Sequence, residues 1–318
     1  MPKKKILIIA PIAYGYSEYI FKSVSKFNSV HSFLIYIEYG KFKYKNFLHR
    51  AQNFLYKTFL NRNLKKEYVN SLVVEQLREI GFVDTIFIIR PDYLNNKTLR
   101  ILRESTHHFK TLFYDSTRRF PAKLKLLPLF DKVYSYDKID VEEYGFEFLT
   151  NYIFEESNSK DYDYLFFNIF TFDYRFDLVE KLAMYIEHRN WSKSIFVFNH
   201  NGVLESDYLN VISEPIPVDE MGDIIKSCKI MIDIQRDDQI GLSFRVFEAL
   251  GHRKKLVTTN IDIVNYDFYN PQNILFIDPN NIKIPTSFVE SPYVDIPKHI
   301  LDPYRIDNWV RKVFELED

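Results

Sequence analysis

The sequence predicts an α/β protein of two domains, each built around a parallel sheet. Three observations predict it. The chain has 318 residues, more than the ~100–200 of one typical domain. Short runs of Ile, Val, Phe and Tyr alternate with helical patterns, as in βαβ units. A polar stretch at 155–161, with almost nothing a core could bury, separates two such series. We therefore expect domains at 1–155 and 156–318.

The expected elements follow in chain order. Strands in the first half are expected at 5–11, 32–39, 85–90, 111–115 and 132–136, with helices between them, for example at 17–27 and 68–80. Strands in the second half are expected at 164–169, 194–199, 230–234, 256–259 and 274–277, with helices near 175–189, 219–227 and 243–252. An amphipathic terminal helix within 303–318 needs a surface to cover, either in its own domain or on the N-terminal one.

Composition narrows the class of protein. The formal charge of −1 gives no reason to expect nucleic acid as a partner. A single cysteine, Cys228, excludes an internal disulfide framework, fits a reducing compartment, and is best explained as a buried structural thiol. The apolar run at 6–11 stops at Pro11, too early for a signal peptide or a membrane span. We expect a cytoplasmic protein.

The most informative segment is a loop and helix at 239–251. Gly241 permits close approach of the backbone to a ligand, and Ser243 is a good N-cap after Leu242. The amide-rich start of such a helix suits a diphosphate, and Arg245 in the first turn would add charge-assisted hydrogen bonds. Glu248 lies on the same helix face and can accept hydrogen bonds from ribose hydroxyls. The alternative is an ordinary capped helix with an Arg–Glu surface pair.

The pattern Gly-Leu-Ser-x-Arg-x-x-Glu-Ala-Leu at 241–250, followed by Val-Thr-Thr-Asn at 257–260, resembles the donor-binding loop and helix of GT-B glycosyltransferases. The chain is similar to uncharacterised bacterial transferases of capsule and lipopolysaccharide synthesis. Further segments carry this likeness: Ala10-Pro11 with Tyr14-Gly15-Tyr16, Arg90-Pro91, Tyr114-Asp115-Ser116, Phe130-Asp131-Lys132 with Tyr136-Asp137, and 266–274. The resemblance implies two Rossmann-like domains facing across a cleft, the first binding an acceptor and the second a nucleotide-sugar donor. It also implies hexosyltransferase-type activity without a metal.

The resemblance assigns roles around this loop. Arg245 would contact the donor diphosphate, Glu248 the ribose, and Thr259 and Asn260 would face the donor from a strand end. Many retaining members carry a Glu eight residues before the ribose Glu, where this chain has Ile240. Whether Arg175 reaches the phosphates is open.

Candidates for the chemistry follow strands of the first half. A base that deprotonates the acceptor is expected among carboxylates at strand ends, and Asp115 has the best position, followed by Asp92. Both could instead serve turns or caps, and Asp137 fits a cap better than a base. The loop at Tyr14, Gly15 and Tyr16 is expected at the acceptor. No Cys/His spacing suggests a metal site, and no cofactor is expected besides the nucleotide-sugar co-substrate.

Residues 41–66 carry eight Lys or Arg, no Asp or Glu, and interleaved aromatic residues. That composition is typical of an interfacial segment, which would suit a lipid-linked acceptor at the cytoplasmic face of the inner membrane. A core-facing helix with a solvated basic face explains the composition as well.

The preferred hypothesis is glycosyl transfer from a nucleotide sugar to a saccharide or lipid-linked acceptor, in bacterial surface polysaccharide synthesis. A transferase of polyol phosphate from a CDP-linked donor would use the same diphosphate pocket. A non-catalytic two-lobed sugar- or nucleotide-binding protein is the alternative from another class. An NAD-dependent enzyme fits poorly, because no Gly-x-Gly-x-x-Gly follows the first strand.

Overall fold

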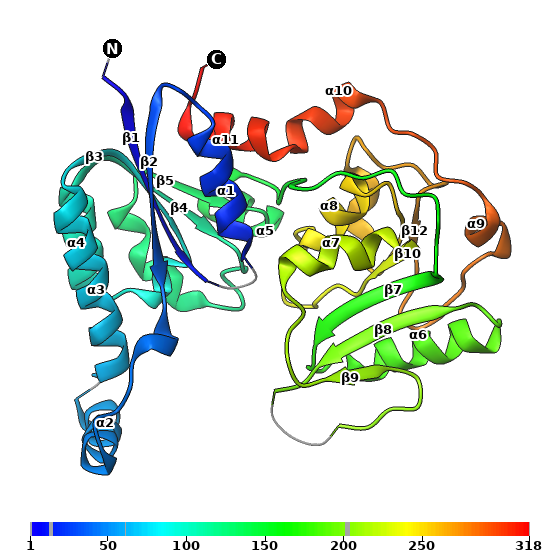
Figure 1. The fold of residues 1–318 in the computed structure, drawn as a ribbon, viewed down its shortest axis with the longest axis horizontal. Coiled ribbons are helices and arrows are strands. Elements are labelled where there is room, and N and C mark those ends of the chain that lie inside the picture. The colour runs from blue at the N-terminus through cyan, green and yellow to red at the C-terminus, as the bar shows by residue number, and fades with distance from the viewer. Residues whose placement is uncertain (1, 13–14, 61, 201–203, 318) are drawn as a thin grey trace. The chain divides into compact units, whose positions relative to one another are not determined.

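The computed structural model describes residues 2–12, 15–60, 62–200 and 204–317. The chain divides into two compact units (Figure 1). Unit 1 comprises Met1–Leu149 and Val310–Asp318, and unit 2 comprises Thr150–Trp309. The division at Leu149 comes a few residues before the expected boundary at 155, because the polar segment is held within unit 2. There the Ser157 amide donates to the carbonyl of Gly251 at 3.0 Å.

Unit 1 has, in its described part, a six-stranded sheet in the order β2-β1-β3-β4-β5-β6, with each neighbouring pair parallel. The strands are β1 (Lys4–Pro11), β2 (Val30–Ile37), β3 (Val83–Ile89), β4 (Thr106–Phe113), β5 (Lys132–Ser135) and β6 (Glu147–Phe148). Residues 6–10 of β1 and all of β3 except Asp84 are buried, as expected for a parallel sheet covered on both faces.

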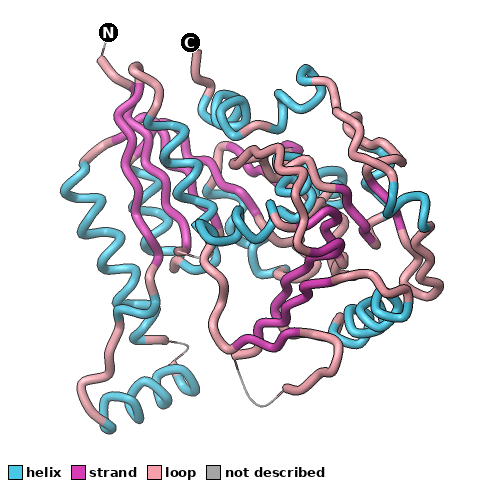
Figure 2. Tube along the Cα trace, turned by 45° about the vertical axis from the view of Figure 1, so that its right-hand side comes forward, coloured by secondary structure: helices cyan, strands magenta, loops and turns pink. Residues whose placement is uncertain are grey.

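Helices cover both faces of this sheet, with α3 and α4 on one side and α1 on the other (Figure 1). The α-helices are α1 (Tyr16–Ser25), α2 (Phe47–Phe59), α3 (Leu64–Ile80), α4 (Asn96–Glu104) and α5 (Lys138–Tyr144). Short 3-10 helices are η2 (Tyr39–Lys41), η3 (Pro91–Tyr93) and η4 (Pro121–Leu129). Helix α2 is set beyond the N-terminal end of α3, away from the sheet, as the turned view also shows (Figure 2).

Unit 2 repeats this architecture. Its sheet, over the described residues, has six parallel strands in the order β12-β11-β10-β7-β8-β9. The strands are β7 (Tyr164–Thr171), β8 (Lys193–Phe198), β9 (Asn210–Ile212), β10 (Cys228–Asp233), β11 (Lys255–Thr258) and β12 (Ile274–Phe276). The helices are α6 (Phe176–His188), α7 (Val218–Lys226), α8 (Phe244–Gly251), α9 (Thr286–Glu290), α10 (Lys298–Leu301) and α11 (Ile306–Phe314), with η5 (Ile261–Asn265) and η6 (Asp302–Tyr304).

The terminal helix α11 ends in unit 1. Phe314 packs edge-on against Phe87 of β3, with ring centroids 5.4 Å apart. Two lysines of the first sheet donate to the last carbonyls of the helix, Lys110 to Val313 at 2.9 Å and Lys4 to Phe314 at 2.7 Å. Cations at the carboxyl end of a helix also complement its dipole. The expected terminal helix therefore covers the first sheet with its last residues.

Candidate functional site

The loop between β10 and α8 is anchored by Asp233, the last residue of β10. Asp233 is buried, and its carboxylate accepts hydrogen bonds from the hydroxyls of Ser243 at 2.7 Å and Thr258 at 2.9 Å. Ser243 caps α8 and Thr258 ends β11. One carboxylate therefore fixes the start of α8 against two adjacent strand ends, and hydrogen bonds to an ionised acceptor are the stronger kind.

Side chains that follow β10 and β11 also hold this loop through hydrogen bonds. The Gln235 amide donates to the Thr259 hydroxyl at 2.8 Å, and its side-chain nitrogen donates to the carbonyl of Gln239 at 2.6 Å. The Asn260 side chain donates to the carbonyl of Ile240 at 3.0 Å. Thr259 and Asn260, predicted to face a donor, thus contact the loop that would receive it.

Gly241 and Leu242 form the buried part of this loop. The carbonyl of Leu242 accepts a hydrogen bond from the buried Asn151 side chain at 2.9 Å. The loop residues are therefore held by polar contacts from three directions, and such rigidity lowers the cost of ordering a loop around a ligand.

Helix α8 begins as the sequence predicts. The Ser243 hydroxyl accepts a hydrogen bond from the amide of Arg245 at 3.2 Å, so Ser243 is the N-cap. The Arg245 guanidinium forms an ion pair with the carboxylate of Glu248. Glu248 is almost fully buried, whereas Arg245 keeps about a fifth of its side chain exposed (20%). The Arg–Glu pair weighed as an alternative is thus present, but its acid is in the core and not on the surface.

A second cluster of charges lies at the neighbouring strand ends. Asp173 and Arg175 follow β7, and Arg236 follows β10, which pairs with β7 in the sheet. The Asp173 carboxylate forms ion pairs with Arg175 at 2.9 Å and Arg236 at 2.7 Å, and Arg175 also donates to the carbonyl of Ile234 at 2.7 Å. Burial raises the pKa of Asp173, but hydrogen bonds and charge from Arg175 and Arg236 outweigh it and leave that pKa below its ordinary value.

In unit 1 the two predicted carboxylates meet around one arginine. Arg90 follows β3 with a left-handed φ of 60°. Its guanidinium binds Asp92 at 2.8 Å and Asp115 at 2.9 Å. Burial raises the pKa of Asp92, but hydrogen bonds and charge from Arg90 outweigh it, so the pKa of Asp92 is lowered. The sequence predicted each acid by itself and missed the arginine that joins them.

Lys123 belongs to the same cluster of charged residues. It is fully buried on η4 and donates to the Asp115 carbonyl at 3.2 Å. Burial lowers the pKa of Lys123 to about 8. Each carboxylate oxygen of Asp115 contacts a cation: Arg90 binds one oxygen and Arg119 binds the other.

The predicted acceptor loop is described in part. Tyr14 lies outside the described residues. Gly15 has a φ of 73°, in the left-handed region that favours glycine, and acts as the N-cap of α1, whose first residue is Tyr16. The cap prediction for Asp137 is confirmed, because its carboxylate accepts from the amides of Ile139 and Asp140 at the start of α5.

Comparison with solved structures identifies the architecture. No protein-family model and no curated protein matches the sequence. An α-glucosyltransferase in complex with UDP and a DNA 13-mer has a TM-score of 0.60 at 10% identity, covering 97% of this chain and 95% of that one. The lipopolysaccharide outer core galactosyltransferase WaaB has a TM-score of 0.51 at 11% identity, covering 98% and 99%. The chain has the GT-B fold.

The GT-B fold does not by itself select one reaction. A UDP-GlcNAc 2-epimerase from Methanocaldococcus jannaschii, in complex with UDP-GlcNAc and UDP, is similar to this chain with a TM-score of 0.52 at 11% identity, covering 98% of each. At such identities the likeness establishes the fold alone. The chemistry has to be argued from the residues at the carboxyl ends of the strands, where open α/β sheets bind ligands.

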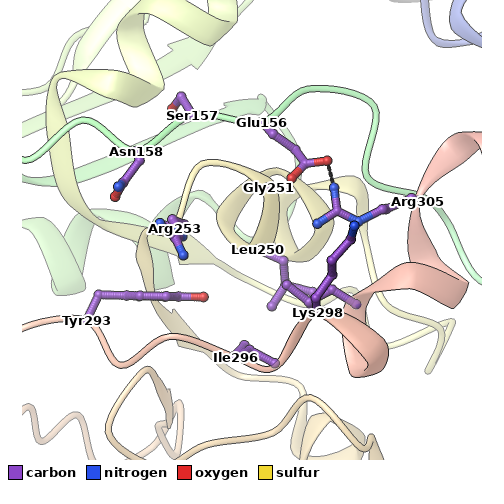
Figure 3. A pocket seen from close by; sticks show the side chains of 11 residues that line it. Glu156, Ser157, Asn158, Leu250, Gly251, Arg253, Tyr293, Ile296, Lys298 and Arg305 are labelled. Carbon is purple, nitrogen blue, oxygen red and sulfur yellow. Dashed lines mark ion pairs between the residues drawn. The ribbon is translucent and has the colours of Figure 1, made fainter.

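A cavity of about 490 Å³ lies at the other end of α8 (Figure 3). Leu250 and Gly251 line it, with Arg253, Lys298 and Arg305 contributing positive charge. Arg305 is paired with Glu156 there, as the dashed line shows. The cavity is therefore separated from Ser243 by the length of α8.

Other predicted features were also placed by the structure. Cys228 is buried at the start of β10, where burial raises its thiol pKa to about 12, so the thiol is structural as predicted. In the described part of the chain, no group of three or more His, Cys, Asp or Glu side chains is arranged to hold a metal ion. Among the described helices, none is long and apolar enough to cross a bilayer.

Proposed function

We propose that this chain is a glycosyltransferase that takes a sugar from a nucleotide-sugar donor bound at the start of α8. The proposal depends on the loop at 235–243, which leads into the N-terminus of α8. Five polar side chains hold this loop in place. A braced loop that opens a helix is the arrangement that binds a diphosphate, through backbone amides and the helix dipole. The likeness in fold to proteins whose structures contain UDP supports the choice of ligand.

Donor recognition would use Arg245 and Glu248 together. In the structure the buried Glu248 carboxylate pairs with the Arg245 guanidinium. An arriving diphosphate would accept hydrogen bonds from the Arg245 guanidinium, and the ribose hydroxyls would donate to Glu248. The pair therefore keeps a buried charge compensated until the donor brings its own partners. Arg175 and Arg236, each with 18% of the side chain exposed, are the nearby strand-end cations that could add to the phosphate contacts.

The acceptor would bind unit 1, at the edge where Asp92 and Asp115 meet Arg90. We propose Asp115 as the group that accepts the proton of the acceptor hydroxyl, with Asp92 as the second candidate. Hydrogen bonds and charge from Arg90 outweigh the effect of burial and lower the pKa of Asp92, which counts against Asp92 as a base. Gly15 and Tyr16 would form the neighbouring wall of the acceptor site. A metal is not part of the proposal, since arginines and the helix dipole would neutralise the leaving diphosphate.

The biological setting belongs to the same proposal. The acceptor would be a saccharide or a lipid-linked saccharide in surface polysaccharide synthesis, handled in the cytoplasm or at the inner membrane. The likeness in fold to a lipopolysaccharide outer core galactosyltransferase supports this setting.

Nucleotide binding tests the donor site directly. A thermal-shift panel of UDP, GDP, CMP, CDP and TDP should show stabilisation by one nucleotide class, because a ligand that binds only the folded state raises its apparent stability. Arg245→Ala and Glu248→Ala should each abolish that shift. Arg253→Gln is the matched control, since it alters an arginine at the other end of α8, 39% exposed and paired with Asp295.

The outcome separates the alternatives. A CDP-selective shift, followed by release of CMP with a CDP-polyol, would favour polyol-phosphate transfer. Tight binding of a free sugar without any nucleotide shift would favour a non-catalytic binding protein. Unchanged nucleotide binding in both folded variants would refute the assignment of the pocket to α8.

A further inference from the structure

Helix α2 presents its apolar face to solvent. Phe47, Phe54 and Leu55 are spaced i, i+7 and i+8, which places them on one face, with Leu48 and Phe59 on its flank. These five side chains are between 51% and 81% exposed. In a surface helix of a globular protein that face would be turned to the core, so α2 has the reverse of the usual orientation.

Polar contacts hold the opposite face of α2 to unit 1. Asn53, 2% exposed, is the buried residue of the helix. Its side chain donates to the Tyr44 hydroxyl at 2.6 Å and accepts from the Leu64 amide at 2.8 Å, and so joins the helix to the start of α3. Asn46 caps the helix by accepting from the His49 amide at 2.9 Å. The orientation of α2 is therefore fixed by specific hydrogen bonds, which keep the aromatic side chains directed outward.

Uncompensated positive charge surrounds this apolar face. Lys43, Lys45, Arg50 and Lys57 are exposed, and none of them pairs with a carboxylate within the described residues. A cavity of about 450 Å³ lies beside the carboxyl end of α2. Its charged lining consists of Lys57, Arg62, Lys66 and Glu67.

The charge decides which partner fits. A second copy of the chain would bring an identical cluster of cations against this one, and like charges at an interface are repelled. An anionic bilayer offers hydrocarbon for the aromatic face and negative headgroups for the surrounding lysines and arginines. The cavity beside α2 adjoins the predicted acceptor site, because Lys66 in its lining donates to the carbonyl of Asp92 at 2.9 Å.

We propose that α2 is an interfacial anchor that docks unit 1 on an anionic lipid bilayer. Phe47, Phe54 and Phe59 enter the hydrocarbon boundary, and the flanking cations bind lipid phosphates. Only the purpose of the anchor depends on the proposed function: docking would bring Asp92 and Asp115 to a lipid-linked acceptor. The docking itself is independent of nucleotide binding.

Vesicle sedimentation of the full chain tests the anchor. The wild type should sediment with vesicles of phosphatidylcholine and phosphatidylglycerol, and far less with phosphatidylcholine alone. The triple variant F47Q/F54Q/F59Q should lose binding by about tenfold or more for each ring that inserts. The variant K43Q/K45Q/R50Q should lose about fivefold per removed charge on the anionic vesicles only, and added salt should have the same effect.

The controls keep the result interpretable. Phe82→Gln removes another exposed phenylalanine (51%), one that lies after α3, and should bind vesicles as the wild type does. The α2 variants should keep the wild-type unfolding temperature and nucleotide shift. Failure of the wild type to bind anionic vesicles would overturn the proposal, as would unchanged binding by the triple variant. Self-association that the triple variant abolishes would show instead that this face covers a second copy. If the wild type binds anionic vesicles but no nucleotide, the proposed function is refuted and the membrane anchor is still supported.

Discussion

Asp233 offers the sharpest test of the donor loop. Its carboxylate accepts hydrogen bonds from Ser243 and Thr258, so Asp233→Ala removes both bonds at once. The buried Thr258 hydroxyl and the half-buried Ser243 hydroxyl then lose their acceptor. Asp233→Asn keeps the shape and one acceptor oxygen, but turns an amide toward the second hydroxyl. The first change should therefore cost about twice as much as the second.

The magnitude follows from the two bonds. A hydrogen bond to a charged group contributes about 1.5–3 kcal/mol, so Asp233→Ala should lower the free energy of unfolding of unit 2 by about 3–6 kcal/mol and Asp233→Asn by about half of that. For a unit of this size, 1 kcal/mol shifts the midpoint by about 2–4 °C, so the alanine variant should melt about 6–24 °C lower. Nucleotide affinity should fall by about tenfold or more, because the loop must then be ordered by the ligand.

Thermal unfolding with and without nucleotide measures both effects in one experiment. Asp237→Ala is the control: it removes the same charge from an exposed position in the same loop and should change neither the midpoint nor the affinity. The reasoning is refuted if Asp233→Ala melts within a degree or two of the wild type and binds nucleotide equally well. A loss of stability with intact affinity would show that Asp233 supports the sheet without shaping the loop.

Three further predictions concern packing and charge. Gly251→Ala should destabilise unit 2 by several degrees in thermal unfolding, because the added Cβ would lie 2.1 Å from the carbonyl oxygen of Glu155, whereas Gly40→Ala meets nothing within 4 Å and should be neutral. Burial lowers the pKa of His252 to about 4, so the folded state keeps it neutral. The contribution of neutral His252 to the free energy of unfolding should be complete above about pH 6.5 and should fall by about 3 kcal/mol as the pH falls toward 4. Urea titrations at each pH should show that His252→Gln removes this decline. Lys110→Met should cost unit 1 about 1–3 kcal/mol in urea unfolding, because the carbonyl of Val313 loses its buried donor.

Much of the fold follows from local pattern. The central strands were predicted within a few residues, because parallel strands buried on both faces appear as continuous apolar runs. Strands β6 and β9 were missed, since two or three residues carry no periodicity and depend on pairing with β5 and β8. The unit boundary was displaced for a similar reason: the polar segment at 155–161 lacks core residues but is bound by backbone contacts to α8, which composition does not reveal.

The local structure of the candidate site was predicted where one segment contains all its parts. Ser243 and Arg245 could be placed at a helix start because capping depends on neighbours in sequence. Asp233 and Arg90 were missed, since their roles come from hydroxyls and carboxylates that reach them from other strands. The sequence pattern also could not predict which face of α2 is exposed. Interleaved basic and aromatic residues define two faces, but the contact of Asn53 with the rest of unit 1 determines which face is turned to solvent.

The assignment of Val310–Asp318 to unit 1 has a consequence for how the protein is made. Domains usually fold in order as they leave the ribosome. Here the first sheet must wait for Phe314, which reaches Phe87 only after the whole of unit 2 has been synthesised. During that interval the ring of Phe87 lacks the contact with Phe314 that it has in the complete fold.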